Sequence, residues 1–436
     1  MSDRLDAALR EHWWGAVAAV ARRCGDLEVA EDAVQEACVA AVTQWPRDGI
    51  PPHPRGWLIT TAWHKAVDVL RRDSVRPERE ATAWRQQADD ADQAGPPGGG
   101  PIGDDELALI FACCHPALDS AVRVALTLRS VCGLSTAQVA AVFVVTEPTM
   151  AQRLVRAKRK IRQAGISLSV PDPQDLAGRL NAVLRVVYLV FTEGHRASSG
   201  AELIRGELCE QAIGLARALA QVLPAEPEVR GLLALLLLTD ARRAARTGAD
   251  GALVLLADQD RTSWNRAEIA EGEVLIEEAL RCRRPGPYQL HAAIAACHSG
   301  APSADATDWR QIAALYGELV RYEPTPVVMA NQAVAIAMAD GPRAGLAILD
   351  RLAAEGRLNQ WPQLHIARAE LLRQLGRAAD ALTAYRAALD TGPHPAEREF
   401  ISRRIGGLVT AGAPAAPAGR PPMTENTASF PAYGEP

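Results

Sequence analysis

Several residues in the C-terminal half have the types that acid/base catalysis uses. Asp258 and Asp260 are separated by one residue, and Arg261 and Trp264 follow them closely, while Thr192-Glu193-Gly194-His195 lies upstream. A pair of carboxylates near a histidine can transfer protons in a hydrolase. The same polar residues can instead cap the following helix and form ion pairs across helix packing, or form an interdomain cluster that joins this half to the rest of the chain. All three readings stay open from the sequence.

The eight cysteines indicate buried thiols rather than a metal site. They show no CxxC spacing, and most lie among apolar residues of helical pattern. Cys113-Cys114-His115 gathers three candidate ligands, but a structural zinc site needs about four and the sequence has no second cluster. We therefore expect no catalytic residue, no metal and no cofactor.

The clearest chemical signal is positive charge on one short helix. Between Met150 and Ala164 there are six Lys or Arg residues and no carboxylate. Met150, Leu154, Ala157 and Ile161 share one face of this helix, which leaves the charges on the others. A local positive field of this strength favours an anionic partner. The residues placed to reach it are Gln152, Arg153, Arg156 and Arg159.

This basic helix is the second half of a helix-turn-helix pattern from Leu134 to Arg162. Ser135 suits the N-cap of the first helix, and Thr146 and Pro148 suit the start of the second. A helix pair of this kind can place its second helix in a DNA major groove. Taken alone, the stretch also fits an ordinary surface helix pair with solvated charges.

Two further helices with distinct surfaces are predicted within residues 8–73. The first follows Asp26, an N-cap residue, and a loop rich in Pro and Gly from Trp45 to Pro54 separates it from the second. The acidic and polar face of the first helix holds Glu28, Glu31, Asp32, Gln35 and Glu36. The second carries Trp57, Trp63, Asp68, Arg71 and Arg72. These dissimilar surfaces indicate two different partners.

The composition indicates a helical globular protein of several domains. The chain has 436 residues, of which 48% are apolar and 5% aromatic, and its net charge is −5. An acidic total does not exclude DNA binding, because the basic residues are unevenly distributed. The longest apolar run, Leu232 to Leu238, is too short to span a bilayer. We therefore expect a cytoplasmic protein without a membrane partner.

Three motifs in sequence order resemble the extracytoplasmic-function sigma factors, which give bacterial RNA polymerase its promoter choice. AEDAVQEACVAAVTQW (30–45) resembles sigma region 2, whose acidic helix docks on polymerase. HPRGWLITTAWHKAVDVLRR (53–72) resembles the helix that reads and melts the minus-10 element, and residues 134–162 resemble the region 4 reader of the minus-35 element. The resemblance implies a DNA-binding initiation factor with core RNA polymerase and promoter DNA as partners.

The same resemblance implies roles for individual residues. Asp32, Gln35 and Glu36 would bind polymerase. Trp57, Trp63, Asp68, Arg71 and Arg72 would form or support the minus-10 surface, and Gln152, Arg153, Arg156 and Arg159 would contact minus-35 DNA. Cys38, His64, Val144 and Ala151 depart from the residues usual in the family, which bears on promoter sequence more than on class.

The remaining C-terminal half has the pattern of a repeat protein. In Gln363 to Pro393, small, aromatic and turn residues fall at tetratricopeptide offsets, and matching positions recur at steps of about 35 residues. The residues that carry this pattern are Gly376, Ala381, Tyr385, Ala388 and Pro393, then Gly341 and Leu346, then Ile312, Tyr316, Leu319 and Pro324. The chain resembles the subgroup of these sigma factors with a tetratricopeptide-like helical extension, which implies an α-solenoid.

The expected fold is all-α, with two small sigma domains, a flexible linker and this large extension. The boundaries are 8–73 for region 2, 74–103 for the linker, 104–166 for region 4, 170–286 for a helical extension, 287–410 for the repeats and 411–436 for a disordered tail. We expect the extension to regulate the sigma domains in cis, by inhibition or as a required scaffold. The alternatives are an enzyme with a site in the C-terminal half and a scaffold that binds a protein or peptide in the groove of the repeats.

Overall fold

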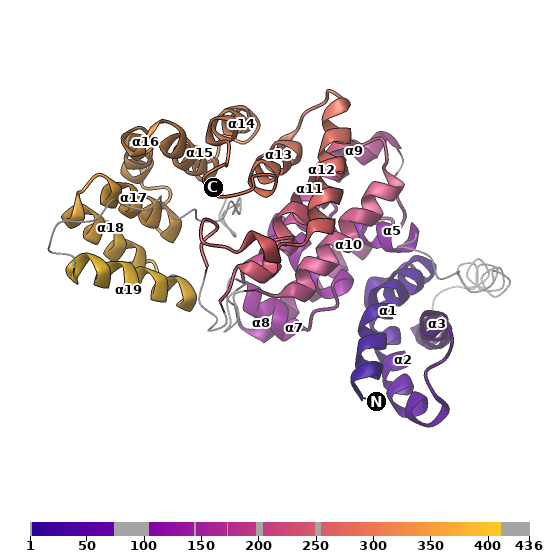
Figure 1. Ribbon diagram of the computed structural model, residues 1–436. Helices are drawn as coiled ribbons and strands as arrows, with labels where there is room; N and C mark the ends of the chain where they lie inside the picture. The colour runs from indigo at the N-terminus through magenta and orange to yellow at the C-terminus, as the bar shows by residue number, and fades with distance from the viewer. Residues whose placement is uncertain are drawn as a thin grey trace. The chain divides into compact units, whose positions relative to one another are not determined.

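The computed structural model describes residues 2–73, 104–143, 145–171, 173–197, 204–248 and 254–410. Within these ranges the regular elements are helices, which confirms the all-α prediction (Figure 1). The chain divides into two compact units, Met1–Val190 and Phe191–Pro436. The expected linker 74–103 and tail 411–436 lie outside the described residues.

The first unit begins with a bundle of three helices, α1 (Ser2–Cys24), α2 (Leu27–Asp48) and α3 (Pro54–Asp73), drawn in indigo in Figure 1. Asp26 caps α2 as expected, because its carboxylate accepts the backbone N–H groups of Glu28 and Val29. The prediction of a loop from Trp45 was wrong, since α2 continues to Asp48. Trp45 is buried with its ring edge-on to Trp57 at a centroid distance of 5.4 Å, so packing extends the helix past Pro46.

Five short elements follow in the same unit: α5 (Asp104–Cys113), α6 (Ser120–Leu126), the π-helical turn η1 (Thr127–Val131), α7 (Thr136–Val142) and α8 (Glu147–Gln163). Ser135 and Gln138 form a capping box at the start of α7, which confirms the first predicted cap. Pro148 lies in the first turn of α8 as predicted. Thr146 has the N-cap position, but its hydroxyl contacts the Thr149 hydroxyl at 2.8 Å and makes no capping bond.

The eight cysteines are free thiols; five are buried as predicted, whereas Cys38 and Cys297 are half-buried and Cys282 is exposed. Cys113, Cys114 and Cys132 are fully enclosed in the core around α5 and η1. Burial raises the pKa of Cys114 and of Cys132 to about 12, so both stay protonated at neutral pH. Among the described residues, no group of three or more His, Cys, Asp or Glu could hold a metal ion.

The second unit opens with helices of the kind predicted for residues 170–286. They are the end of α9 (Pro173–His195), α10 (Gly206–Val222), α11 (Pro227–Asp240), the short turns η2 (Arg243–Ala245) and η3 (Arg261–Ser263), and α12 (Arg266–Arg281). After α11 ends at Asp240, the buried Arg246 side chain donates to the carbonyl of His195.

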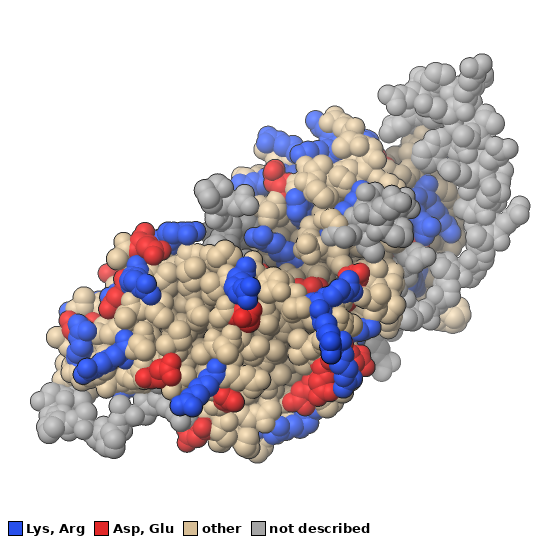
Figure 2. All heavy atoms as spheres, turned by 90° about the horizontal axis from the view of Figure 1, so that it is seen from above, with Lys and Arg blue, Asp and Glu red and all other residues tan. Residues whose placement is uncertain are grey.

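Seven consecutive helices complete the second unit: α13 (Pro287–Ser299), α14 (Trp309–Tyr322), α15 (Pro326–Asp340), α16 (Pro342–Glu355), α17 (Pro362–Gln374), α18 (Ala378–Asp390) and α19 (Pro395–Thr410). Each packs on its neighbours in the sequence, as a solenoid requires. On the face drawn in Figure 2, Lys and Arg are interspersed with Asp and Glu over the left part of the view.

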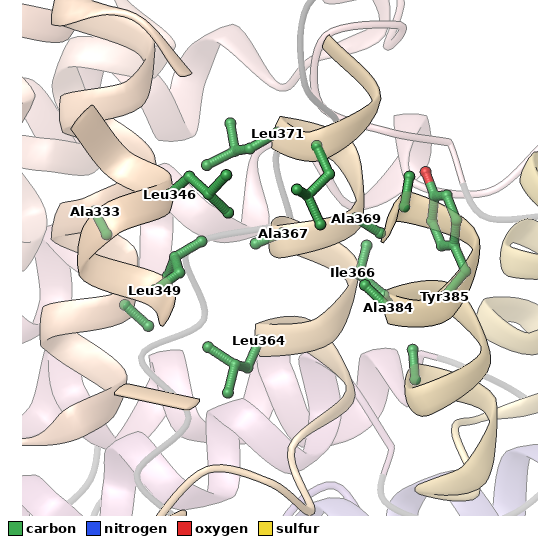
Figure 3. Packing of buried hydrophobic residues seen from close by; sticks show 14 of the residues in the cluster. Ala333, Leu346, Leu349, Leu364, Ile366, Ala367, Ala369, Leu371, Ala384 and Tyr385 are labelled. Atoms are coloured by element: carbon green, nitrogen blue, oxygen red, sulfur yellow. The ribbon is translucent and has the colours of Figure 1, made fainter. Parts of the chain in front are cut away.

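The predicted repeat positions lie where the helices pack. Ala381, Tyr385 and Ala388 are fully buried in α18, and Gly376 has φ +73° in the turn before it. Figure 3 shows α17 between its two neighbours, with Leu364 and Leu371 toward α16 and Ala369 toward α18. Tyr316 of α14 lies in a separate small cluster with buried residues of α13 and α15.

Two long-range contacts add to this stacking. Leu255, from the segment between α11 and α12, is buried in the core formed by α15 to α19. Arg196, just after α9, forms an ion pair with Glu397 of α19 at 2.5 Å. The second unit is therefore held by contacts between its beginning and its end as well as between consecutive helices. The structure contains no described helix that is long and apolar enough to cross a bilayer.

Candidate nucleic-acid interface

Helix α8 separates its apolar and basic residues as the sequence predicts. Met150, Leu154, Ala157 and Ile161 are buried against the rest of the first unit. Gln152, Arg153, Arg156 and Arg159 are exposed. The guanidinium groups therefore reach solvent on the side of the helix that could enter a DNA groove, where bidentate donors of this type read guanine edges and hold phosphates.

Helix α3 places its five candidate residues in different environments. Trp63 is only 8% exposed, with the Arg23 guanidinium 5.8 Å from its ring centroid, so it supports the bundle. Trp57 is half-buried against Trp45. Asp68 and Arg71 are exposed, and the Arg72 side chain lies outside the described residues. The helix thus presents its polar side to solvent while its tryptophans face inward.

Helix α2 exposes the three residues predicted to bind polymerase, Asp32, Gln35 and Glu36. Glu36 forms an exposed ion pair with Lys65 of α3 at 3.3 Å. The sequence reasoning missed Val39 and Val42, which continue this side of α2 and are 64% and 50% exposed. Val39 and Val42 lie four and seven residues after Gln35, which is the helical spacing that could have found them. Together they make a face that is acidic at one end and apolar at the other.

One expectation for α2 was wrong. Glu31 was placed on the exposed acidic face, but it is 3% exposed. It accepts hydrogen bonds from the Ser130 hydroxyl and from Lys158 Nζ of α8, each at 2.5 Å. The pKa of the neighbouring Asp32 is raised, mainly by partial desolvation. Lys158 lowers it, and Glu28, Glu31 and Glu36 raise it further. The acidic helix therefore contacts the basic one within the first unit.

The polar residues of the C-terminal half form a local structure. The Asp260 carboxylate accepts hydrogen bonds from the Thr262 hydroxyl and the Thr262 N–H at the start of η3, and these two bonds, the hydroxyl first, lower its pKa. Arg261 donates to the carbonyls of His298 and Ala301 at 2.7 Å and lies 4.5 Å from the buried Trp264 ring. Asp258 is exposed. These contacts are those of a capped turn pinned to the end of α13.

A basic exposed helix in a helix-turn-helix and an acidic exposed helix in a three-helix bundle are the features of the sigma-70 class of initiation factors. Residues 11–76 match the family model for sigma-70 region 2, and residues 108–161 match the model for sigma-70 region 4. Residues 179–280 match a family of unknown function (DUF6596). The two sigma matches cover the elements on which the candidate residues lie.

One relative matches most of the chain, and another matches part of it. An uncharacterised protein of Rhizobium meliloti is 43% identical over 403 residues, which is 92% of this chain and 95% of that protein. The probable ECF RNA polymerase sigma factor SigI of Mycobacterium tuberculosis is 33% identical over 174 residues, or 39% of this chain and 59% of SigI. No solved structure matches. The chain belongs to the extracytoplasmic-function sigma factors, with a helical C-terminal extension.

Proposed function

We propose that this sigma factor recognises and melts the minus-10 element through α3, reads the minus-35 element through α8, docks on core RNA polymerase through α2, and is controlled in cis by its extension. The observation that carries the proposal is α8, which exposes Gln152, Arg153, Arg156 and Arg159 above a fully buried apolar stripe. A cytoplasmic location follows from these partners. A protein or peptide partner for the repeats stays a prediction.

Run-off transcription tests the assignment of α8. Reconstituted with core polymerase on a cognate promoter, the variant with Arg153→Ala and Arg156→Ala should lose at least tenfold in activity, because it loses two cations that can contact bases or phosphates. Its DNA affinity should also depend less steeply on salt, by about two counterions. Arg321→Ala is the matched control, since Arg321 is an exposed helical arginine of α14. Wild-type activity in the double variant would show that these arginines are only solvated.

The interspersed charges on the left of the face drawn in Figure 2 argue against nucleic-acid binding there. A surface that binds nucleic acid concentrates positive charge, as α8 does. Ending the chain after Ile166 tests control in cis. Run-off activity above that of the full chain would indicate inhibition, and activity below it would indicate a required scaffold. Equal activity, with helicity of the shortened chain intact, would contradict control by the extension.

A further inference from the structure

We propose that the repeats bind a segment of their own chain as a ligand: the connection between α11 and α12 docks Leu255 on the helices from α15 to α19, and a partner protein binds there by displacing it. Such a partner must offer a peptide segment with an aliphatic side chain for the position of Leu255. This site is separate from the DNA-reading helices, so its test is independent of promoter recognition.

The helix pair α11–α12 has the packing of the first repeat in the solenoid. In the second helix of each pair, buried residues recur at intervals of four and then three positions. They are Gly272, Ile276 and Ala279 in α12, Ile312, Tyr316 and Leu319 in α14, Gly345, Leu349 and Leu352 in α16, and Ala381, Tyr385 and Ala388 in α18. An added Cβ on Gly272 would clash with Leu238 of α11, and one on Gly345 would clash with Ala333 of α15. The pattern seen in the later repeats therefore begins at α11.

This first repeat carries a long insertion between its two helices. Gly341 alone connects α15 to α16, and residues 375–377 connect α17 to α18, whereas residues 241–265 connect α11 to α12. We call residues 241–265 the insertion; its residues 249–253 lie outside the described part of the chain. The two ends of the insertion meet, since the N–H of Asn265 donates to the carbonyl of Ala241 at 2.8 Å. Long loops with closed ends are frequently functional, and insertions in repeat proteins are often on the binding face.

Leu255 of the insertion is buried in the core of later repeats. It is 9% exposed and belongs to an apolar cluster whose other buried members all come from residue 327 onward. They include Val327 of α15, Leu364 of α17 and Ile401 of α19. The neighbouring Leu256 is also buried but lies outside this cluster. Leu255 is therefore an anchor from the first repeat in the core of the third and fourth repeats.

The backbone around Leu255 forms a turn with its own hydrogen bonds. The N–H of Asp258 donates to the carbonyl of Leu255 at 2.8 Å, and Gln259 Nε2 donates to the carbonyl of Val254 at 3.3 Å. The turn can leave α15 to α19 without losing these bonds, so the cost of leaving is mainly the exposure of the leucine. Burial of one leucine strengthens an interaction by roughly tenfold to a hundredfold. Docking of this strength is reversible.

The first turns of α17 contain buried polar atoms that the insertion does not satisfy. Nε1 of Trp361, Oε1 of Gln363 and Nδ1 of His365 are buried and have no hydrogen-bond partner in the described part of the chain. Leu364, between the last two, belongs to the same cluster as Leu255. Unpaired polar atoms are rare in native interiors because each is destabilising. A peptide backbone supplies both N–H donors and carbonyl acceptors, so a displacing segment that pairs with these atoms would bind more tightly than the resident one.

Displacement is tested in the full chain with a peptide of its own sequence. The probe is a dye-labelled peptide of residues 254–265, VLLADQDRTSWN, and the same peptide with Leu255→Asp is its control. The protein variants are Leu255→Ala, which weakens the resident segment, and Leu280→Ala, which changes an exposed leucine of α12 and is the matched control. Fluorescence anisotropy measures peptide binding. Spin labels on unnatural amino acids at Asp258 and Ser402, both exposed, report the distance between the insertion and α19.

We expect weak peptide binding by the wild type and by Leu280→Ala, because the tethered segment competes at an effective concentration on the order of millimolar. The Leu255→Ala chain should bind the peptide about tenfold more tightly than the wild type, since its own segment docks less well. The distances between its spin labels should become longer and more broadly distributed. The Leu255→Asp peptide should not bind to any of these chains.

Unchanged peptide affinity in a Leu255→Ala chain of native helicity would overturn the proposal, because Leu255 would then be an ordinary core residue. If that variant does not fold, the wild type decides. Peptide at about millimolar concentration should lengthen the Asp258–Ser402 distance in a measurable fraction of wild-type molecules, and an unchanged distance would overturn the proposal. An equal effect of the Leu255→Asp peptide would also overturn it, since the leucine would not be the anchor.

Discussion

At the scale of single residues, His298 shows how the second unit fixes the charge of a buried side chain. It lies at the end of α13 with its ring edge-on to Trp309 at 5.3 Å. Burial is the main cause that lowers its pKa to about 3, and Arg242 and Arg261 lower it further. A protonated imidazole would place a third positive charge beside two arginines. The histidine is therefore neutral in the folded protein.

This neutral histidine predicts an acid sensitivity of the second unit. Its pKa is lower in the folded state than the ordinary 6.5, so the unfolded chain binds the proton first and stability falls as the pH drops below 6.5 toward 3. Between pH 7.5 and pH 5 the loss from this group is about 2 kcal/mol. Denaturant unfolding of the wild type and of His298→Gln at both pH values measures it. The variant should lose about 2 kcal/mol less, and equal losses would show that His298 does not titrate on unfolding.

At the scale of elements, the sequence correctly predicted those helix faces and caps that depend on residues close together in the chain. The buried and exposed sides of α8 and the Ser135 cap both follow from residues within a few turns of each other. The sequence predictions were wrong where contacts with residues far along the chain determine burial or helix length. Glu31 looked exposed because Ser130 and Lys158 lie far along the chain, and α2 passes Pro46 because Trp57 packs on Trp45. Exposure of Asp32, Gln35 and Glu36 on the proposed docking face of α2 was predictable, whereas the exposed apolar residues Val39 and Val42 were overlooked.

Helix α2 carries a prediction about polymerase binding. Asp32→Ala with Glu36→Ala should weaken binding to purified core polymerase at least tenfold, because both carboxylates are exposed on the proposed docking face. Val39→Ser should weaken it further by removing apolar contact at the other end of that face.

Thermal unfolding of the variants is the control for this experiment. The Glu36–Lys65 pair is exposed, and such pairs contribute no more than about 1 kcal/mol, so thermal unfolding of the variants should stay close to that of the wild type. Glu318→Ala serves as the matched surface control. Unchanged polymerase affinity in a folded double variant would remove this face from the docking assignment.

At the scale of the whole molecule, the extension departs from a simple stack of repeats. In a solenoid each repeat contacts only its neighbours, so its ends open independently. Here Glu397, in the first turn of α19, contacts both Arg196 and Gln363, the latter at 3.0 Å. Arg196 and Glu397 are 201 residues apart, and no local pattern could indicate that they meet. The contact joins the beginning of the second unit to its last helix.

Glu397 therefore predicts coupled stability within the second unit. Glu397→Ala should lower the free energy of unfolding by about 3 kcal/mol, because it leaves Arg196 and Gln363 without their shared acceptor in a mostly buried site. Hydrogen exchange should rise in α19 and, to a similar extent, at the end of α9 near Arg196. Glu397→Gln, which keeps an acceptor oxygen, should have a smaller effect at both places. If exchange rises in α19 alone, the ends of the unit open independently and the ion pair does not couple them.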